Sequence, residues 1–119
     1  MAQGLYSKTV SIAAATDTAL IAAPTTTNFA GKPERIYVLY LRYGVGTAWT
    51  GGRIRFEDGA GGSVIMRGAT ATVDVDVERY FATMRKDYPG YALTEGNALN
   101  VNTAGTPGAL EVTVIYEIK

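Results

Sequence analysis

The sequence of 119 residues contains no cysteine and no histidine. Without cysteine, the chain forms neither disulfide bonds nor thiolate metal sites. Without histidine, it lacks the commonest general base, the commonest metal ligand and the side chain that titrates near neutral pH. Catalytic triads of the Ser-His-Asp and Cys-His types are therefore impossible. We predict that the protein is not an enzyme and has no catalytic, cofactor-binding or metal-binding residues.

An excess of charge and long hydrophobic runs are missing as well. Eleven basic and eleven acidic residues give a formal net charge of zero, whereas nucleic-acid-binding proteins carry a basic excess. No stretch reaches the roughly 18 apolar residues of a membrane span. Residues 1–4 lack the charged start and apolar block of a signal peptide. We therefore expect a soluble protein, made in the cytoplasm, with neither nucleic acid nor a membrane as its partner.

The residues that are abundant predict β-strands joined by tight turns. Thr, Val, Ile and Tyr are frequent, there are 14 glycines, and helix-favouring residues other than Ala are scarce. The length suits one domain with a single core. We expect a β-sandwich domain over residues 7–119, preceded by a mobile N-terminal arm at residues 1–6.

Strand-like segments recur about every ten residues, which is typical of a β-sandwich or barrel. They cover residues 5–12, 19–23, 35–43, 53–57, 63–67, 72–78, 91–103 and 109–119. The glycine-rich segment 58–62 predicts a hairpin turn, because glycine adopts the positive φ that such turns need. After Val77, the spacing of Tyr80, Phe81 and Met84 also fits a helical turn, so a strand and a helical turn both remain open there.

The segment 35–43 is apolar or aromatic on both faces. Such a strand is buried on both sides, and we predict that a partner subunit covers one of them. Tyr and Trp are enriched at protein interfaces. The predicted interface residues are Leu5, Tyr6, Tyr37, Tyr43 and Trp49, the last in an expected loop at 44–52. For Tyr37, Tyr43 and Trp49, a position in the core fits the sequence equally well.

Three carboxylates alternate with valines over residues 72–78, at Asp74, Asp76 and Glu78. Such a set binds Ca²⁺ when loop oxygens are added, but the neighbouring loops lack the spacing of a calcium-binding loop. A hydrolase also needs two carboxylates, yet any alternating pair on a strand meets the required separation. We favour a solvated strand face whose carboxylates pair with Arg53 and Arg55 across the sheet.

Two segments carry the resemblance to a known family. The first is residues 91–102 (YALTEGNALNVN), followed by Gly108 and residues 112–116 (VTVIY). The second is residues 32–41 (KPERIYVLYL). Together they resemble the small jelly-roll head decoration (cement) proteins of tailed bacteriophages, over about residues 30–119 and mostly through strand and turn signals. The resemblance implies an all-β fold, a single jelly-roll-like β-sandwich of about eight strands.

The same resemblance implies a structural virion protein on the outer capsid surface. Such a protein binds the major capsid protein, stabilises contacts between capsomers and forms homo-oligomers, often trimers. The family has no catalytic residues, so the resemblance assigns none to this chain. A mobile arm at 1–6 would add a strand to a neighbour's sheet edge. Two alternatives stay open: a receptor- or glycan-binding tip of a phage tail or head fibre, with Trp49, Tyr88 and Tyr91 stacked on sugars, and a hydrolase that uses the three carboxylates.

Overall fold

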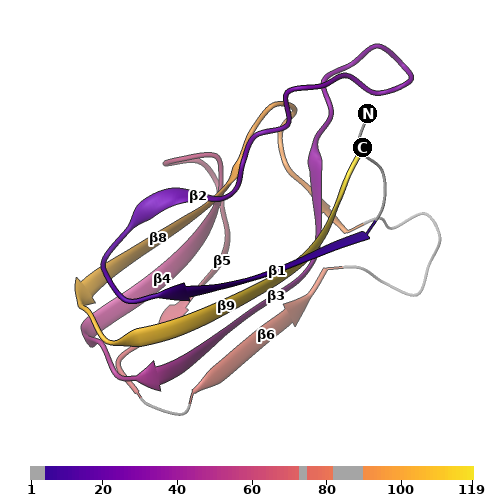
Figure 1. The fold of residues 1–119 in the computed structure, drawn as a ribbon. Coiled ribbons are helices and arrows are strands. Elements are labelled where there is room, and N and C mark those ends of the chain that lie inside the picture. The colour runs from indigo at the N-terminus through magenta and orange to yellow at the C-terminus, as the bar shows by residue number, and fades with distance from the viewer. Residues whose placement is uncertain (1–4, 73–74, 82–89) are drawn as a thin grey trace.

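The computed structural model describes residues 5–72, 75–81 and 90–119, which fold into two antiparallel sheets packed face to face (Figure 1). The described residues form nine strands and contain no helix. The strands are β1 (Leu5–Ile12), β2 (Asp17–Ile21), β3 (Ile36–Thr47), β4 (Thr50–Asp58), β5 (Val64–Ala69), β6 (Asp76–Tyr80), β7 (Tyr91–Ala92), β8 (Leu99–Thr106) and β9 (Ala109–Ile118). The predicted all-β sandwich is confirmed.

The strand order is that of a jelly roll. Sheet A has the order β1-β9-β3-β6, with the short β7 also paired to β3, and sheet B has the order β2-β8-β4-β5. Without β7, the chain is one long hairpin in which β4 pairs with β5, β3 with β6, β2 with β8 and β1 with β9. Rolling up this hairpin brings β9 against β3 and β8 against β4. This is the jelly-roll-like sandwich of about eight strands that the resemblance implies.

The tip of the long hairpin is the predicted turn at 58–62. The N–H of Asp58 donates to the carbonyl of Ser63 at 2.9 Å, and Gly59 and Gly61 have positive φ. The Asp58 carboxylate accepts hydrogen bonds of 2.8–3.1 Å from the backbone and hydroxyl of Thr94 and from the amide of Asn97. These bonds fasten the tip to the loop between β7 and β8.

Several strand boundaries differ from the prediction. β3 extends to Thr47 and β4 begins at Thr50, so the expected loop at 44–52 shrinks to a two-residue connection. Residues 91–103 comprise β7 and the start of β8, with a loop between the two strands. The chain continues as strand β6 through Tyr80, and Met84, on which the helical alternative depended, lies outside the described residues.

The described part of the chain has no helix long and apolar enough to cross a membrane.

A β-bulge in β3 decides which of its aromatic residues enter the core. Ile36 and Val38 face the other sheet, and the register with β9 shifts between Val38 and Tyr40. Beyond the shift, Leu41, Tyr43 and Val45 are buried, while Tyr40 and Arg42 are only half-buried. Tyr37 and Leu39, which come before Tyr40, are half-buried as well. Within one chain, β3 is therefore buried on one face only. The prediction that a partner subunit covers its other face stays a prediction.

Long cationic side chains bridge both open sides of the sandwich. On one side, Lys8 of β1 donates from Nζ to the carbonyl of Leu20 in β2 at 2.9 Å. On the other, Arg79 of β6 donates from Nη1 to the carbonyl of Ile65 in β5 at 3.3 Å. Charged side chains on edge strands disfavour the addition of further strands. The edges of this fold are therefore poor docking sites, which directs attention to its faces.

The structure corrects the extent of the predicted arm. Leu5 and Tyr6 belong to β1, where they pair with Glu117 and Tyr116 of β9. Ring stacking of Tyr6 on Tyr116, with centroids 5.4 Å apart, adds to this pairing. The sandwich therefore includes residues 5 and 6, and residues 1–4 of the predicted arm lie outside the described residues.

Candidate functional site

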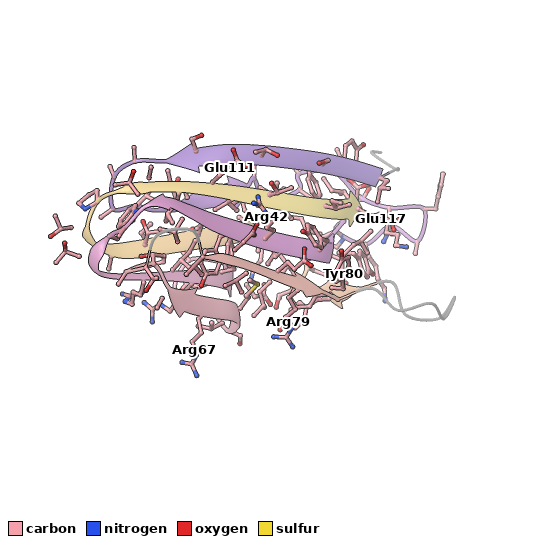
Figure 2. The ribbon with its side chains drawn as sticks, turned by 90° about the horizontal axis from the view of Figure 1, so that it is seen from below. Arg42, Arg67, Arg79, Tyr80, Glu111 and Glu117 are labelled. Carbon is pink, nitrogen blue, oxygen red and sulfur yellow. The ribbon has the colours of Figure 1, made fainter. Side chains whose placement is uncertain are left out.

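The outer face of sheet A carries four rows of side chains that run across its strands. The strand register defines the rows as Leu5, Glu117 and Tyr37; Ser7, Ile115, Tyr40 and Tyr80; Thr9, Thr113, Arg42 and Glu78; and Ser11, Glu111, Gly44 and Asp76. The first two rows contain an aromatic patch, which consists of Leu5, Tyr37, Tyr40, Tyr80 and Ile115. The last two rows contain a charged end, which consists of Arg42, Asp76, Glu78 and Glu111. In Figure 2, Arg42 and Glu111 lie near the middle of the view, and Tyr80 and Glu117 lie toward its right-hand end.

The aromatic patch is open to solvent. Tyr80 is 69% exposed and Leu5 is 68% exposed. The ring of Tyr40 packs against that of Tyr80, with ring centroids 4.8 Å apart. The ammonium of Lys119 lies 5.1 Å from the ring centroid of Tyr37. Large apolar side chains gathered on one solvent-facing surface mark an interaction site more often than single exposed residues do.

At the charged end, Arg42 joins carboxylates from two neighbouring strands. Its guanidinium lies 2.7 Å from Asp76 of β6 and 3.5 Å from Glu111 of β9. The hydrogen bond to Asp76 raises the pKa of Arg42 above its ordinary value. The predicted pairing of these carboxylates with Arg53 and Arg55 is wrong, because β6 pairs with β3 in sheet A while both arginines lie in β4 of sheet B. Asp74 lies outside the described residues.

Tyr40 is fixed by a second carboxylate of β6. Its hydroxyl donates to Oε2 of Glu78 at 2.7 Å. This hydrogen bond, together with desolvation and the negative charge of Glu78, raises the pKa of Tyr40 to about 12. A tyrosine held in this way loses little rotational freedom when a partner binds it.

We expect the Glu78→Gln substitution to lower the pKa of Tyr40 toward its ordinary value of 10.0, because the charged acceptor is removed. The folded pKa lies above the unfolded value, so the Tyr40–Glu78 pair stabilises the fold below pH 10 and this contribution is lost as the pH rises through about 12. Tyrosinate absorbance measures the titration, with Tyr40→Phe identifying the contribution of this residue. Identical curves for wild type and Glu78→Gln would refute the assignment.

A groove of about 510 Å³ runs beside the charged end. Gly44 and Gly46 of β3 form part of its lining, where the lack of side chains leaves space. The walls include Arg42, Asp76 and Glu111. A guanidinium and two carboxylates around an open groove are suited to hydrogen-bonding the hydroxyl groups of a polar ligand. The described residues contain no group of three or more acidic side chains placed to hold a metal ion.

The predicted interface residues separate into two groups. Leu5 and Tyr37 lie in the aromatic patch, and Tyr6 is half-buried beside Tyr116. Tyr43 is 1% exposed and Trp49 is 0% exposed, so both residues lie in the core, which was the alternative to an interface position. The bulge in β3 turns Tyr43 inward, and the tight connection between β3 and β4 places the Trp49 side chain in the core. Neither residue belongs to an exposed surface of this chain.

The predicted interface residues did not include Tyr40, Arg42, Tyr80 or Ile115, which all lie on this face. Ile115 follows the buried Val114 on the solvent side of β9, where alternation gives a detectable signal. Tyr80 lies on the solvent side of β6, a strand whose residues are all exposed or half-buried. Tyr40 gives no such signal, because the bulge reverses the alternation within β3. The grouping of all four residues depends on the register of β3 with β6 and β9, which no local pattern specifies.

No protein-family model matches the chain, and no curated protein matches its sequence. A function is therefore argued from the surface of the molecule.

Proposed function

We propose that this chain is a structural virion protein, a capsid decoration or cement protein that binds the major capsid protein on the outer surface of the capsid and stabilises contacts between capsomers. The observation that carries the proposal is the exposed aromatic patch on sheet A. It is supported by the jelly-roll fold and by the resemblance of residues 30–119 to that family.

The composition of the patch is that of a docking surface. Protein interfaces combine an apolar, aromatic centre with a polar rim. On sheet A the centre is formed by the five residues of the aromatic patch, and the rim by Glu117 and the charged end. The flat sheet and the fixed Tyr40 side chain pre-organise the surface, which reduces the entropy lost on binding. A homo-oligomer, with a trimer favoured, would present several such faces to one capsid and increase the avidity.

The test is co-sedimentation with capsids of the phage that encodes the chain, prepared without this protein. We expect the Leu5→Ser/Tyr80→Ser variant to bind about 30-fold more weakly than wild type, because aromatic anchors at an interface contribute about 2 kcal/mol or more. Both side chains are exposed, so the variant should keep the stability of wild type.

The matched control is Phe29→Ser, which removes an aromatic side chain that is 86% exposed but lies in the connection between β2 and β3, outside the patch. This variant should bind like wild type. Failure of wild type to bind the capsids, or equal binding by the Leu5→Ser/Tyr80→Ser variant, would contradict the proposal.

The groove favours a second candidate function, a receptor- or glycan-binding tip of a phage tail or head fibre. Trp49 is buried and Tyr91 packs against Phe81 with ring centroids 6.0 Å apart, while Tyr88 lies outside the described residues. The sugar-binding surface would instead combine the groove with Tyr40 and Tyr80. On a glycan array, wild-type binding that disappears in an Asp76→Asn/Glu111→Gln variant, without capsid binding, would favour this candidate over the first.

A further inference from the structure

Three arginines lie side by side on the outer face of sheet B. Arg55 of β4 is directly opposite Arg67 of β5. Arg53 lies two residues before Arg55 on the same face of β4, opposite Ala69 of β5. Like charges directly opposite each other on paired strands destabilise a sheet. Figure 2 shows Arg67 projecting outward from the ribbon. Folding alone therefore gives no reason for this arrangement, which we call the arginine cluster.

The rest of the described chain does not neutralise the arginine cluster. Among the described residues, none of the three guanidiniums forms an ion pair, and their one hydrogen bond is from Arg53 to Oδ1 of Asn102 at 3.2 Å. The buried Nε of Arg55 finds no acceptor within the part of the chain that the structure describes. This contrasts with Arg42 on sheet A, which is held by two carboxylates.

The carboxylates nearest to the cluster in the strand register have another partner. Asp17 and Glu57 lie on the same outer face, in the strands β2 and β4. Both accept hydrogen bonds from Nδ2 of Asn100, at 2.7 Å for Asp17 and 2.9 Å for Glu57. Glu57 and Asn100 are buried. Both carboxylates are thus engaged with an amide, and no carboxylate of the described residues forms an ion pair with the three guanidiniums, which are available to a partner.

The arginine cluster borders a shallow hollow of about 390 Å³. Its lining includes the small residues Gly52, Gly68 and Ala69, so the hollow is formed where small side chains lie beside the long arginine side chains. Planar guanidinium groups bind carboxylates in a bidentate fork, which gives short and strong hydrogen bonds. The hollow lies on sheet B, and the aromatic patch lies on sheet A, so the two surfaces are on opposite sides of the sandwich.

We propose that the arginine cluster is a second docking surface and that it takes a carboxylate-rich protein surface. This inference rests on the proposed function, because a protein that joins neighbouring capsid subunits needs contacts in more than one place. A nucleic acid fits less well. It requires an extended basic stripe and aromatic platforms, whereas the cluster is compact and the outer face of sheet B carries no aromatic side chain among the described residues.

The experiment uses poly-L-glutamate as the probe of carboxylate binding. We expect saturable, salt-sensitive binding by the wild-type protein. An Arg55→Gln/Arg67→Gln variant should bind roughly tenfold more weakly, because two charge-assisted contacts are lost. The matched control is Lys32→Gln/Lys119→Gln, which removes the same charge outside the cluster and should bind like wild type.

Parallel titrations with heparin and double-stranded DNA test the chemistry of the partner. Tighter binding of either one than of poly-L-glutamate would overturn the proposal in favour of a sulfate or phosphate polyanion. Unchanged binding of poly-L-glutamate by the cluster variant would overturn it as well. Thermal unfolding guards against misfolding: the cluster variant should be at least as stable as wild type, because a like-charge pair has been removed.

The capsid experiment separates this inference from the proposed function. If the cluster variant keeps full capsid binding while the Leu5→Ser/Tyr80→Ser variant loses it, the proposed function stands and the second docking surface is refuted. If wild type fails to bind capsids but binds poly-L-glutamate through the cluster, the docking surface stands and the proposed function is refuted. Loss of capsid binding in both variants supports both.

Discussion

Replacement of Trp49 by alanine is expected to lower the free energy of unfolding by about 3–5 kcal/mol. Trp49 is the largest fully buried side chain of the chain's described part. Trp49 lies in the two-residue connection through which the chain passes from sheet A to sheet B, and its backbone N–H donates to the carbonyl of Thr70 at 2.9 Å. Truncation leaves a cavity at the point where the two sheets are joined, so little collapse is possible.

Urea unfolding followed by far-ultraviolet circular dichroism measures this effect, since the variant has no tryptophan left to observe. The control is Trp49→Phe, which keeps an aromatic ring and removes an indole N–H that has no acceptor in residues 5–72, 75–81 and 90–119. It should destabilise the protein clearly less than alanine does. A loss below about 1 kcal/mol for Trp49→Ala, as for a surface residue, would return Trp49 to the surface and restore its predicted place in an interface.

The fold class was predictable because hydrophobic alternation is a local signal. In β4, Ile54 and Phe56 alternate with arginines, and both apolar residues are buried as predicted. The turn at 58–62 was predictable for the same reason, since its glycines are adjacent in sequence. Eight such segments with the spacing of an antiparallel sandwich leave few arrangements other than a barrel or a jelly roll.

The errors arose where structure depends on contacts between distant segments. The bulge after Val38 turns Tyr43 inward, and nothing in the alternation of residues 35–43 reveals it. Asn100 alternates with Leu99 and Val101, as a solvent-facing residue does, yet it is buried. Its amide is satisfied there because Asp17 and Glu57 accept its hydrogen bonds. Strand pairing likewise gave Asp76 the partner Arg42 in place of the expected arginines of β4.

The candidate surfaces were the least predictable part, because each is assembled by register. The Tyr40–Tyr80 contact requires β3 to pair with β6, and the Arg55–Arg67 pair requires β4 to pair with β5 without a shift at that point. Individually these residues look like ordinary strand residues. Only their placement on opposite faces of one sandwich gives the molecule an aromatic surface on one side and a basic surface on the other.

The second large effect is expected at Gly105 in β8, where alanine should lower the free energy of unfolding by about 2–6 kcal/mol. Gly105 has φ of 111°, a conformation that L side chains rarely adopt, and such a residue costs about 1–3 kcal/mol. A Cβ at this position would also lie 2.7 Å from Cα of Gly52 and 2.9 Å from the carbonyl oxygen of Thr50. Both atoms belong to the backbone of β4, so relief requires the two strands to move apart, which adds a further cost of about 1–3 kcal/mol.

Two matched glycine substitutions separate these contributions in the same denaturation assay. Gly96→Ala tests backbone conformation alone, because Gly96 has φ of 76° and no atom within 4 Å of an added Cβ; we expect a loss of about 1 kcal/mol. Gly46→Ala tests neither effect, since its Cβ would make an ordinary contact of 3.9 Å with Ala109, and should stay within about 0.5 kcal/mol of wild type. Equal losses for Gly96→Ala and Gly105→Ala would show that β4 and β8 separate without cost, and that their close approach does not constrain the sandwich.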